Sequence, residues 1–60
     1  MRVLDVQVGQ RFKVQNDDRV YQKIEYEDGG CCSPDANSIE VETNTKLFIY
    51  NTLEATLWTD

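Results

Sequence analysis

Two neighbouring cysteines and eleven carboxylates are the side chains that could do chemistry in this 60-residue chain, which contains no histidine. Cys31 and Cys32 are adjacent and cannot join distant segments, and a normal disulfide needs Cα atoms about 4.4 Å or more apart. We therefore expect free thiols, which suits a reducing cytoplasm. A zinc site needs about four ligands, and Glu27, Asp28 and Asp35 would have to complete the set. The sequence thus predicts no metal site and no cofactor.

Pairs of close carboxylates could supply an acid and a base, as in Asp17 with Asp18 or Glu25 with Glu27. Proton transfer requires a pocket that moves the pKa of one group away from that of the other, and so short a chain has little room for one. The first pair also falls in a predicted turn, where solvated acids are common. A nucleophilic cysteine would need an activating base. We expect no enzyme.

Short alternations of apolar and polar residues, separated by Asn, Asp and Gly, favour strands throughout the chain. Five strands are predicted, over residues 11–15, 19–26, 38–42, 46–50 and 52–58. The last segment also fits a helix capped by Thr52, and the pattern leaves both open. Residues 1–60 are predicted to form one all-β domain, either a small five-stranded SH3-like barrel or a curled antiparallel sheet.

The expected positions of the strands follow from their patterns. Apolar residues on both faces of 46–50 predict that this strand lies at the centre of the sheet, and the last strand is expected to pair with the first. Gly9 and Asn44 are expected in turns with left-handed backbone. The alternation directs one set of side chains into the core: Phe12, Val14, Val20, Ile24, Ile39 and Val41. Tyr26 is expected on the same face of its strand as Val20 and Ile24.

Three blocks of the sequence carry a resemblance to a known class: Leu4-x-Val6-x-Val8-Gly9-x-x-Phe12, Val20-Tyr21-x-Lys23-Ile24 and Asn37-Ser38-Ile39-Glu40-Val41-x-Thr43. Over about positions 4 to 50 the chain resembles small accessory proteins encoded by tailed bacteriophages. In sequences of that type Gly often follows the last Thr, where this chain has Asn44. The resemblance implies a host-takeover product that binds and blocks a host protein in the host cytoplasm, and it implies no catalytic residues.

Charge is divided unevenly along the chain. Residues 1–26 carry five basic and four acidic side chains, whereas residues 27–60 carry one basic and seven acidic ones, so the net charge is -5. We predict that Glu40 and Glu42, with Glu54 beside them, form an outward acidic face that steers the protein to a basic surface. The alternative is a solvated face that keeps the domain soluble.

Aromatic residues are predicted on the sheet face opposite the core: Tyr21, Phe48, Tyr50 and Trp58. Tyr and Trp are enriched at the energetic centres of protein interfaces, which favours a role in partner binding. The alternative is that these rings pack across strands as a second small core.

The leading hypothesis is therefore a non-enzymatic accessory protein that binds, and inhibits, a host or defence protein through these acidic and aromatic residues. A second hypothesis is a structural or virion component that forms homo-oligomers through Phe48, Tyr50 and Trp58. A third is nucleic-acid binding by the cations of the first hairpin, Arg11, Lys13, Arg19 and Lys23, although the negative net charge disfavours it. No apolar stretch approaches the roughly 20 residues that span a bilayer, and the N-terminus does not match a signal peptide, so no membrane partner is expected.

Overall fold

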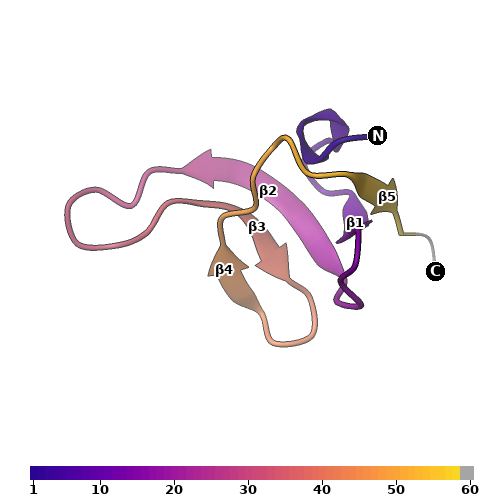
Figure 1. Ribbon diagram of the computed structural model, residues 1–60. Helices are drawn as coiled ribbons and strands as arrows, with labels where there is room; N and C mark the ends of the chain where they lie inside the picture. Colours follow the sequence, from indigo (N-terminus) through magenta and orange to yellow (C-terminus); the bar gives the residue numbers. More distant parts are fainter. Residues whose placement is uncertain (59–60) are drawn as a thin grey trace.

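Five strands pair antiparallel in the spatial order β4-β3-β2-β1-β5 in the computed structural model, which describes residues 1–58 (Figure 1). Their bounds are β1 Arg11–Val14, β2 Tyr21–Glu27, β3 Ala36–Glu40, β4 Thr45–Leu47 and β5 Ala55–Leu57, preceded by a 3-10 turn, η1, over Val3–Asp5. The prediction of an all-β chain with a curled five-stranded sheet is confirmed. The sheet is open, because β4 and β5 lie at its two edges. Within residues 1–58 no helix is long and apolar enough to cross a membrane.

The antiparallel pairing of the first two strands and the strand near the C-terminus are as the sequence predicts, whereas the faces of β2 are not. In β1 and β2, Phe12 lies opposite Tyr21. The C-terminal segment is a strand over Ala55–Leu57 and pairs with β1, so the helical alternative is wrong. Gly9 and Asn44 both have positive φ, at 93° and 59°, as expected of these turns.

The predicted central position of strand 46–50 is wrong. β4 contains only Thr45–Leu47 and lies at an edge, while β2 occupies the middle of the sheet. After Leu47 the chain leaves β4 and must reach β5 at the opposite edge. Residues 48–54, which we call the crossing segment, therefore pass over the sheet, as the orange trace in Figure 1 shows. Apolar residues occur on both sides of this run because it is partly buried against the sheet and not because it is a central strand.

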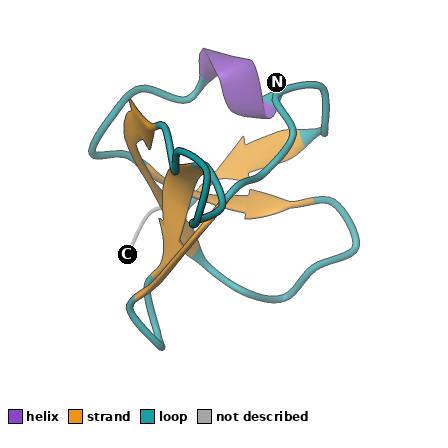
Figure 2. Ribbon diagram, turned by 90° about the vertical axis from the view of Figure 1, so that its left-hand side faces the viewer, coloured by secondary structure: helices purple, strands orange, loops and turns teal. Residues whose placement is uncertain are grey.

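The N-terminal turn holds the crossing segment by backbone hydrogen bonds. The Val3 N–H donates to the carbonyl of Leu53 at 2.9 Å, and the Leu4 N–H donates to that of Asn51 at 3.2 Å. Figure 2 shows η1 set against one end of the curled strands. Between these layers lies a small core, formed by Val3, Val6, Phe12, Tyr21, Ile49 and Ala55, with Val14 and Leu47 packed at its margin.

The predicted core face of β2 and β3 is inverted. Tyr21 is only 4 % exposed and its ring centroid lies 5.8 Å from that of Phe12, so its expected outward position is wrong. Four residues expected in the core are half-buried outside it: Val20, Ile24, Ile39 and Val41. The cause is the pairing of Phe12 with Tyr21, because directly opposite residues share a face and a shift by one residue exchanges the two faces.

A hydrogen bond satisfies the polar end of the buried Tyr21. Its hydroxyl donates to Asp17 Oδ2 at 2.6 Å, in the turn between β1 and β2. This bond lowers the pKa of Asp17, whereas burial of the ring, followed by the same bond, raises the pKa of Tyr21. A tyrosine can therefore serve as a core residue here without leaving its hydroxyl unpaired.

Asn37 fixes the crossing segment to the sheet. Its buried side-chain amide donates from Nδ2 to the carbonyl of Ile49 at 2.8 Å and accepts the Ile49 N–H on Oδ1 at 2.9 Å. Ser38 Oγ donates to the same Oδ1 at 3.2 Å. The amide thus pairs with both backbone groups of Ile49 as a neighbouring strand would. No pattern in the sequence points to this role, since Asn37 lies just before the predicted strand 38–42.

We expect Phe12→Ala to lower the free energy of unfolding by about 3–5 kcal/mol, because it removes a fully buried ring from a small core. Urea denaturation followed by circular dichroism measures this change. Val8→Ala, at an exposed position, is the control and should stay within about 0.5 kcal/mol of the parent chain. Equal unfolding free energies for the two variants would contradict the proposed core.

We expect Asn37→Ala to lower the free energy of unfolding by about 1–3 kcal/mol for each Ile49 backbone group that loses its partner in the interior. The matched control is Thr52→Ala, which truncates an exposed side chain of the crossing segment and should change stability by no more than about 0.5 kcal/mol. The same denaturation experiment measures both. If Asn37→Ala were as stable as the control, the amide would not be what holds the crossing segment.

Candidate interaction site

Three exposed aromatic rings form a continuous row, which we call the aromatic ladder: Tyr26, Phe48 and Tyr50. They are 59 %, 41 % and 68 % exposed. The rings of Tyr26 and Phe48 meet edge to face with centroids 6.4 Å apart, and those of Phe48 and Tyr50 do so at 5.6 Å. This geometry is favourable for aromatic pairs, so the rings support one another while remaining open to solvent.

The crossing segment positions two of the three rings of the aromatic ladder. Ile49 points into the core and is held by Asn37, and the residues on either side of it, Phe48 and Tyr50, are exposed. The bond to Asn37 therefore sets which side of the crossing segment faces outward.

An irregularity in β2 positions the third ring of the aromatic ladder, that of Tyr26. Lys23 pairs with Ser38 and Glu27 pairs with Ala36, so three residues of β2 lie where β3 has one. Such a bulge bends the strand and redirects its side chains. Tyr26, which the sequence placed on the core face of its strand beside Val20 and Ile24, lies within this bulge and is exposed. That expectation was wrong because the pairing of Phe12 with Tyr21 turns the face of Val20, Ile24 and Tyr26 away from the core.

A carboxylate adjoins the ladder and closes the loop between β2 and β3. Asp35 Oδ2 accepts a hydrogen bond from the Tyr26 hydroxyl at 2.6 Å, and Oδ1 accepts the Gly29 N–H at 3.0 Å. The Ser33 N–H donates to the carbonyl of Gly29 at 3.2 Å. A Cβ on Gly29 would stand 2.0 Å from the carbonyl oxygen of Ser33, so no other residue fits there. We call residues 28–35 the clasp loop.

The hydrogen bonds that Asp35 accepts from Tyr26 and Gly29 hold the clasp loop, and we call them the clasp. They change the pKa values of Asp35 and Tyr26. The hydrogen bond from Tyr26, followed by that from the Gly29 N–H, lowers the pKa of Asp35. The same bond to Asp35 raises the pKa of Tyr26. The loop is therefore held by an ionised carboxylate and a neutral phenol across the physiological range of pH.

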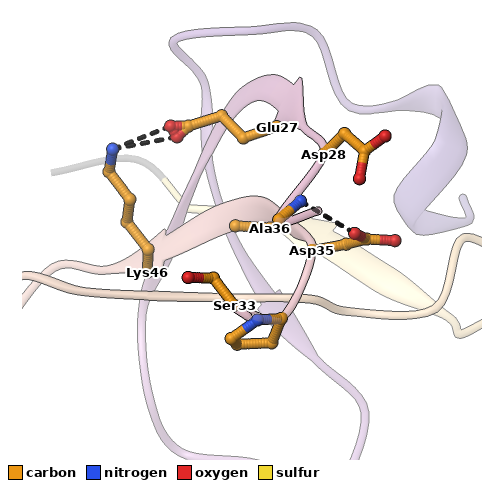
Figure 3. Close-up of a pocket in the computed structure, with 8 residues that line it drawn as sticks. Glu27, Asp28, Ser33, Asp35, Ala36 and Lys46 are labelled. Carbon is orange, nitrogen blue, oxygen red and sulfur yellow. Dashed lines mark hydrogen bonds and ion pairs between the residues drawn. The ribbon is translucent and has the colours of Figure 1, made fainter. Parts of the chain in front are cut away.

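Two open cavities lie on either side of Asp35. The first, of about 530 Å³, lies between the end of β2 and the clasp loop (Figure 3). In it Glu27 and Lys46 pair at 2.8 Å on one side, and the carboxylates of Asp28 and Asp35 lie on the other. The second, of about 320 Å³, adjoins the ladder and is lined by Lys23, Tyr26, Asp35, Asn37, Phe48 and Asn51.

Acidic side chains outnumber basic ones around the ladder, although Lys23 and Lys46 also line the adjoining cavities. Residues 25–36 contain four acidic side chains and no basic one: Glu25, Glu27, Asp28 and Asp35. Lys46 from β4 neutralises one of them, through Nζ contacts of 2.8 and 2.9 Å to the two oxygens of Glu27. Within the described part of the chain, no three His, Cys, Asp or Glu side chains gather in a way that could hold a metal ion.

The three predicted acidic residues do not form one face. The side chain of Glu40 is 14 % exposed, pairs with Arg19 at 3.3 Å and accepts a hydrogen bond from Thr43. Its expected outward position is wrong because it lies opposite the buried Tyr21. Glu42 is exposed in the turn after β3. Glu54 directly precedes β5 at the other edge of the sheet, and its carboxylate lies 3.6 Å from the N-terminal amino group.

The predicted aromatic group is divided in the structure. Phe48 and Tyr50 come together in the ladder, and Tyr26 takes the place expected for Tyr21, which is buried. Trp58 follows the opposite edge strand, β5, and packs under Lys13, whose Nζ lies 4.5 Å from the ring centroid. Phe48, Tyr50 and Trp58 therefore do not share a surface for self-association.

The cations of the first hairpin are engaged locally. Lys23 Nζ donates to the carbonyl of Val3 at 3.2 Å, Arg19 pairs with Glu40, and Lys13 covers Trp58. Lys23 lies opposite Ser38 on the core side of β2, whereas Lys13 lies on the other face of the sheet. These side chains do not assemble into one phosphate-binding row.

Sequence reasoning missed Tyr26, Asp35 and Asn37 as parts of the site. One signal could have suggested Asp35, because carboxylates near a Gly-Gly turn often accept its N–H groups. Comparison of the chain with protein-family models, with curated proteins and with solved structures returned no match. The function is therefore argued from the geometry and charge of the site.

The clasp should be intact only within a window of pH. Because the pKa of Asp35 is lowered, the stabilisation from its ionised form is complete above the ordinary value of 3.8 and is lost as pH falls through the lowered value. Because the pKa of Tyr26 is raised, the stabilisation from its neutral form is complete below 10.0 and is lost as pH rises through the raised value.

We therefore expect Tyr26→Phe to raise the pKa of Asp35 toward 3.8, with a part of the lowering retained through Gly29. Titration of the side-chain carboxyl ¹³C resonances by NMR measures this change. Tyr50→Phe removes a hydroxyl from the same ladder and should leave the Asp35 titration unchanged. An unchanged titration in Tyr26→Phe would show that the phenol does not hold the clasp.

Proposed function

We propose that this protein is a non-enzymatic binding module whose aromatic ladder, with the adjoining carboxylates, binds an arginine- or lysine-bearing segment of a partner protein. The observation that carries the proposal is the row of exposed, edge-to-face rings next to Asp35. A row of this kind is unusual on a small monomeric domain, which normally keeps large apolar side chains apart or covered.

Preorganisation favours binding at the ladder. Tyrosine and phenylalanine bury a large area on contact while losing little conformational freedom, and tyrosine is frequent at interface hot spots. Phe48 and Tyr50 flank the anchored Ile49, and Tyr26 is held through its hydroxyl by Asp35. Because these rings are already ordered, a partner need not order them on binding.

Charge indicates the chemistry of the partner. A guanidinium or ammonium group is attracted to the face of an aromatic ring and forms strong hydrogen bonds with carboxylates. An aromatic ring and carboxylates lie side by side at this site, since Tyr26 contacts Asp35 and Asp28 lies in the neighbouring cavity. The net charge of -5 would also accelerate encounters with a basic surface and repel a phosphate backbone.

The resemblance to phage accessory proteins supports a host or defence protein as the partner, in the host cytoplasm. Binding inhibits the partner when the bound basic segment is part of the surface that the partner uses for its own function. The two exposed free thiols, Cys31 and Cys32, agree with a reducing compartment.

A peptide titration tests the chemistry of the site. We expect a blocked peptide containing two arginines to shift the NMR resonances of Tyr26, Phe48 and Tyr50, and the same peptide with neutral citrulline in place of arginine to shift them far less. Phe48→Ala should weaken binding about tenfold, which corresponds to about 1.4 kcal/mol. Trp58→Ala, which truncates another exposed ring, is the matched control and should leave affinity unchanged.

The same variants test the biological partner. A protein captured from host lysate should carry a basic surface, and its capture should be lost with Phe48→Ala and retained with Trp58→Ala. Equal binding of the arginine and citrulline peptides would contradict recognition of a cation. A dimer in sedimentation that Phe48→Ala dissociates would assign the ladder to self-association instead.

A further inference from the structure

Cys31 and Cys32 occupy the middle of the clasp loop, which projects from one end of the β2–β3 pair (Figure 1). Both thiols are exposed, and their sulfur atoms lie 3.1 Å apart. The binding function proposed above makes no use of them. Two thiols on neighbouring residues with their sulfurs in contact are instead suited to chemistry with each other.

The two sulfurs are close enough to join without movement of the rest of the domain. A disulfide bond is about 2.05 Å long, so the sulfurs need to approach by about 1 Å. The described residues contain no cis peptide, which places the two Cα atoms about 3.8 Å apart. That separation is shorter than the roughly 4.4 Å at which ordinary disulfides begin. The closed ring would therefore be strained.

Strain and exposure determine what kind of disulfide this would be. Strained or exposed disulfides have more oxidising potentials than structural ones and are readily reduced, as regulatory and catalytic disulfides are. A bond between adjacent residues also closes no long loop, so it adds little to the stability of the fold. The pair fits a reversible redox reaction and does not fit a structural cross-link.

The clasp keeps the pair together. Gly30, with φ of 67°, turns the chain immediately before Cys31, and the Ser33 N–H bonds back to the carbonyl of Gly29 immediately after Cys32. Asp35 then ties Gly29 to the far end of the loop. Because the backbone on both sides is fixed, the second thiol stays beside the first throughout a reaction, which favours an intramolecular step over a second intermolecular one.

We propose that Cys31 and Cys32 form a redox-active vicinal dithiol that exchanges with small disulfides, such as glutathione disulfide. One thiolate attacks a sulfur of the oxidant, which forms a mixed disulfide and releases one glutathione thiolate. The neighbouring thiolate then attacks the protein sulfur of that mixed disulfide and releases the second glutathione. The dithiol loses two electrons and two protons, and the oxidant becomes two molecules of glutathione.

Mass spectrometry of the full chain after incubation with glutathione disulfide and an acid quench tests the proposal. We expect the oxidised chain to be lighter by two hydrogen atoms, to lose both titratable thiols, and to recover them with excess reduced glutathione. Its midpoint should be more oxidising than that of thioredoxin measured in the same buffers. Accumulation of a stable glutathione adduct on the parent chain, of a disulfide-linked dimer, or of unreacted thiols would overturn the proposal.

Single-thiol variants provide the matched control. Cys31→Ser and Cys32→Ser change exposed positions and should each end as a glutathione adduct, because neither can close the ring. Gly29→Ala tests the contribution of the clasp, since its Cβ would collide with the loop backbone. The mixed disulfide should persist longer in this variant than in the parent chain. Equally fast ring closure would overturn the role of the clasp in holding the pair.

Discussion

The hydrogen bonds between the Asn37 amide and the backbone of Ile49 are the interaction on which the rest of the structure depends. Because β4 and β5 lie at opposite edges, the chain between them must cross the sheet, and a crossing backbone has no ladder partner for its N–H and C=O groups. The amide supplies both partners in the interior. Ile49 is thereby held in the core, and Phe48 and Tyr50 are directed to the surface.

The small core explains why few other arrangements would be stable. A domain of this size buries only about 60 % of the surface of its unfolded chain, so each covering element contributes a large share. The crossing segment supplies Ile49 and the N-terminal turn supplies Val3 and Val6, while Phe12 and Tyr21 come from the sheet. The two cavities beside Asp35 are open to solvent, so the chemistry proposed for this site lies on the surface.

The clasp loop carries two surface features that differ in their chemistry. Its carboxylate, Asp35, orients Tyr26 at the edge of the aromatic ladder, while its middle presents Cys31 and Cys32 to solvent. Both rely on Gly29, whose N–H bonds Asp35 and whose lack of a side chain lets the loop close. A short loop can do this because a few local hydrogen bonds, and not core packing, fix its conformation.

The sequence by itself determined the local conformation of most of the chain. Alternation and turn residues predict the first hairpin and the left-handed positions of Gly9 and Asn44, because these depend on near neighbours and on backbone preferences. The pairing of the last strand with the first was also expected, although it joins distant segments. The exposed positions of Phe48 and Tyr50 were also predicted correctly. The all-β class follows from these patterns.

Only the tertiary structure decided which faces are buried. The second strand has apolar residues at both Val20 and Tyr21, so its pattern fits either face, and its pairing with Phe12 selects Tyr21 for the core. The same pairing leaves Tyr26 outside the core, and Asn37 is buried because the crossing segment passes over it. A sequence pattern fixes the state of the backbone, whereas burial depends on which distant segment covers each strand, and no local pattern contains that information.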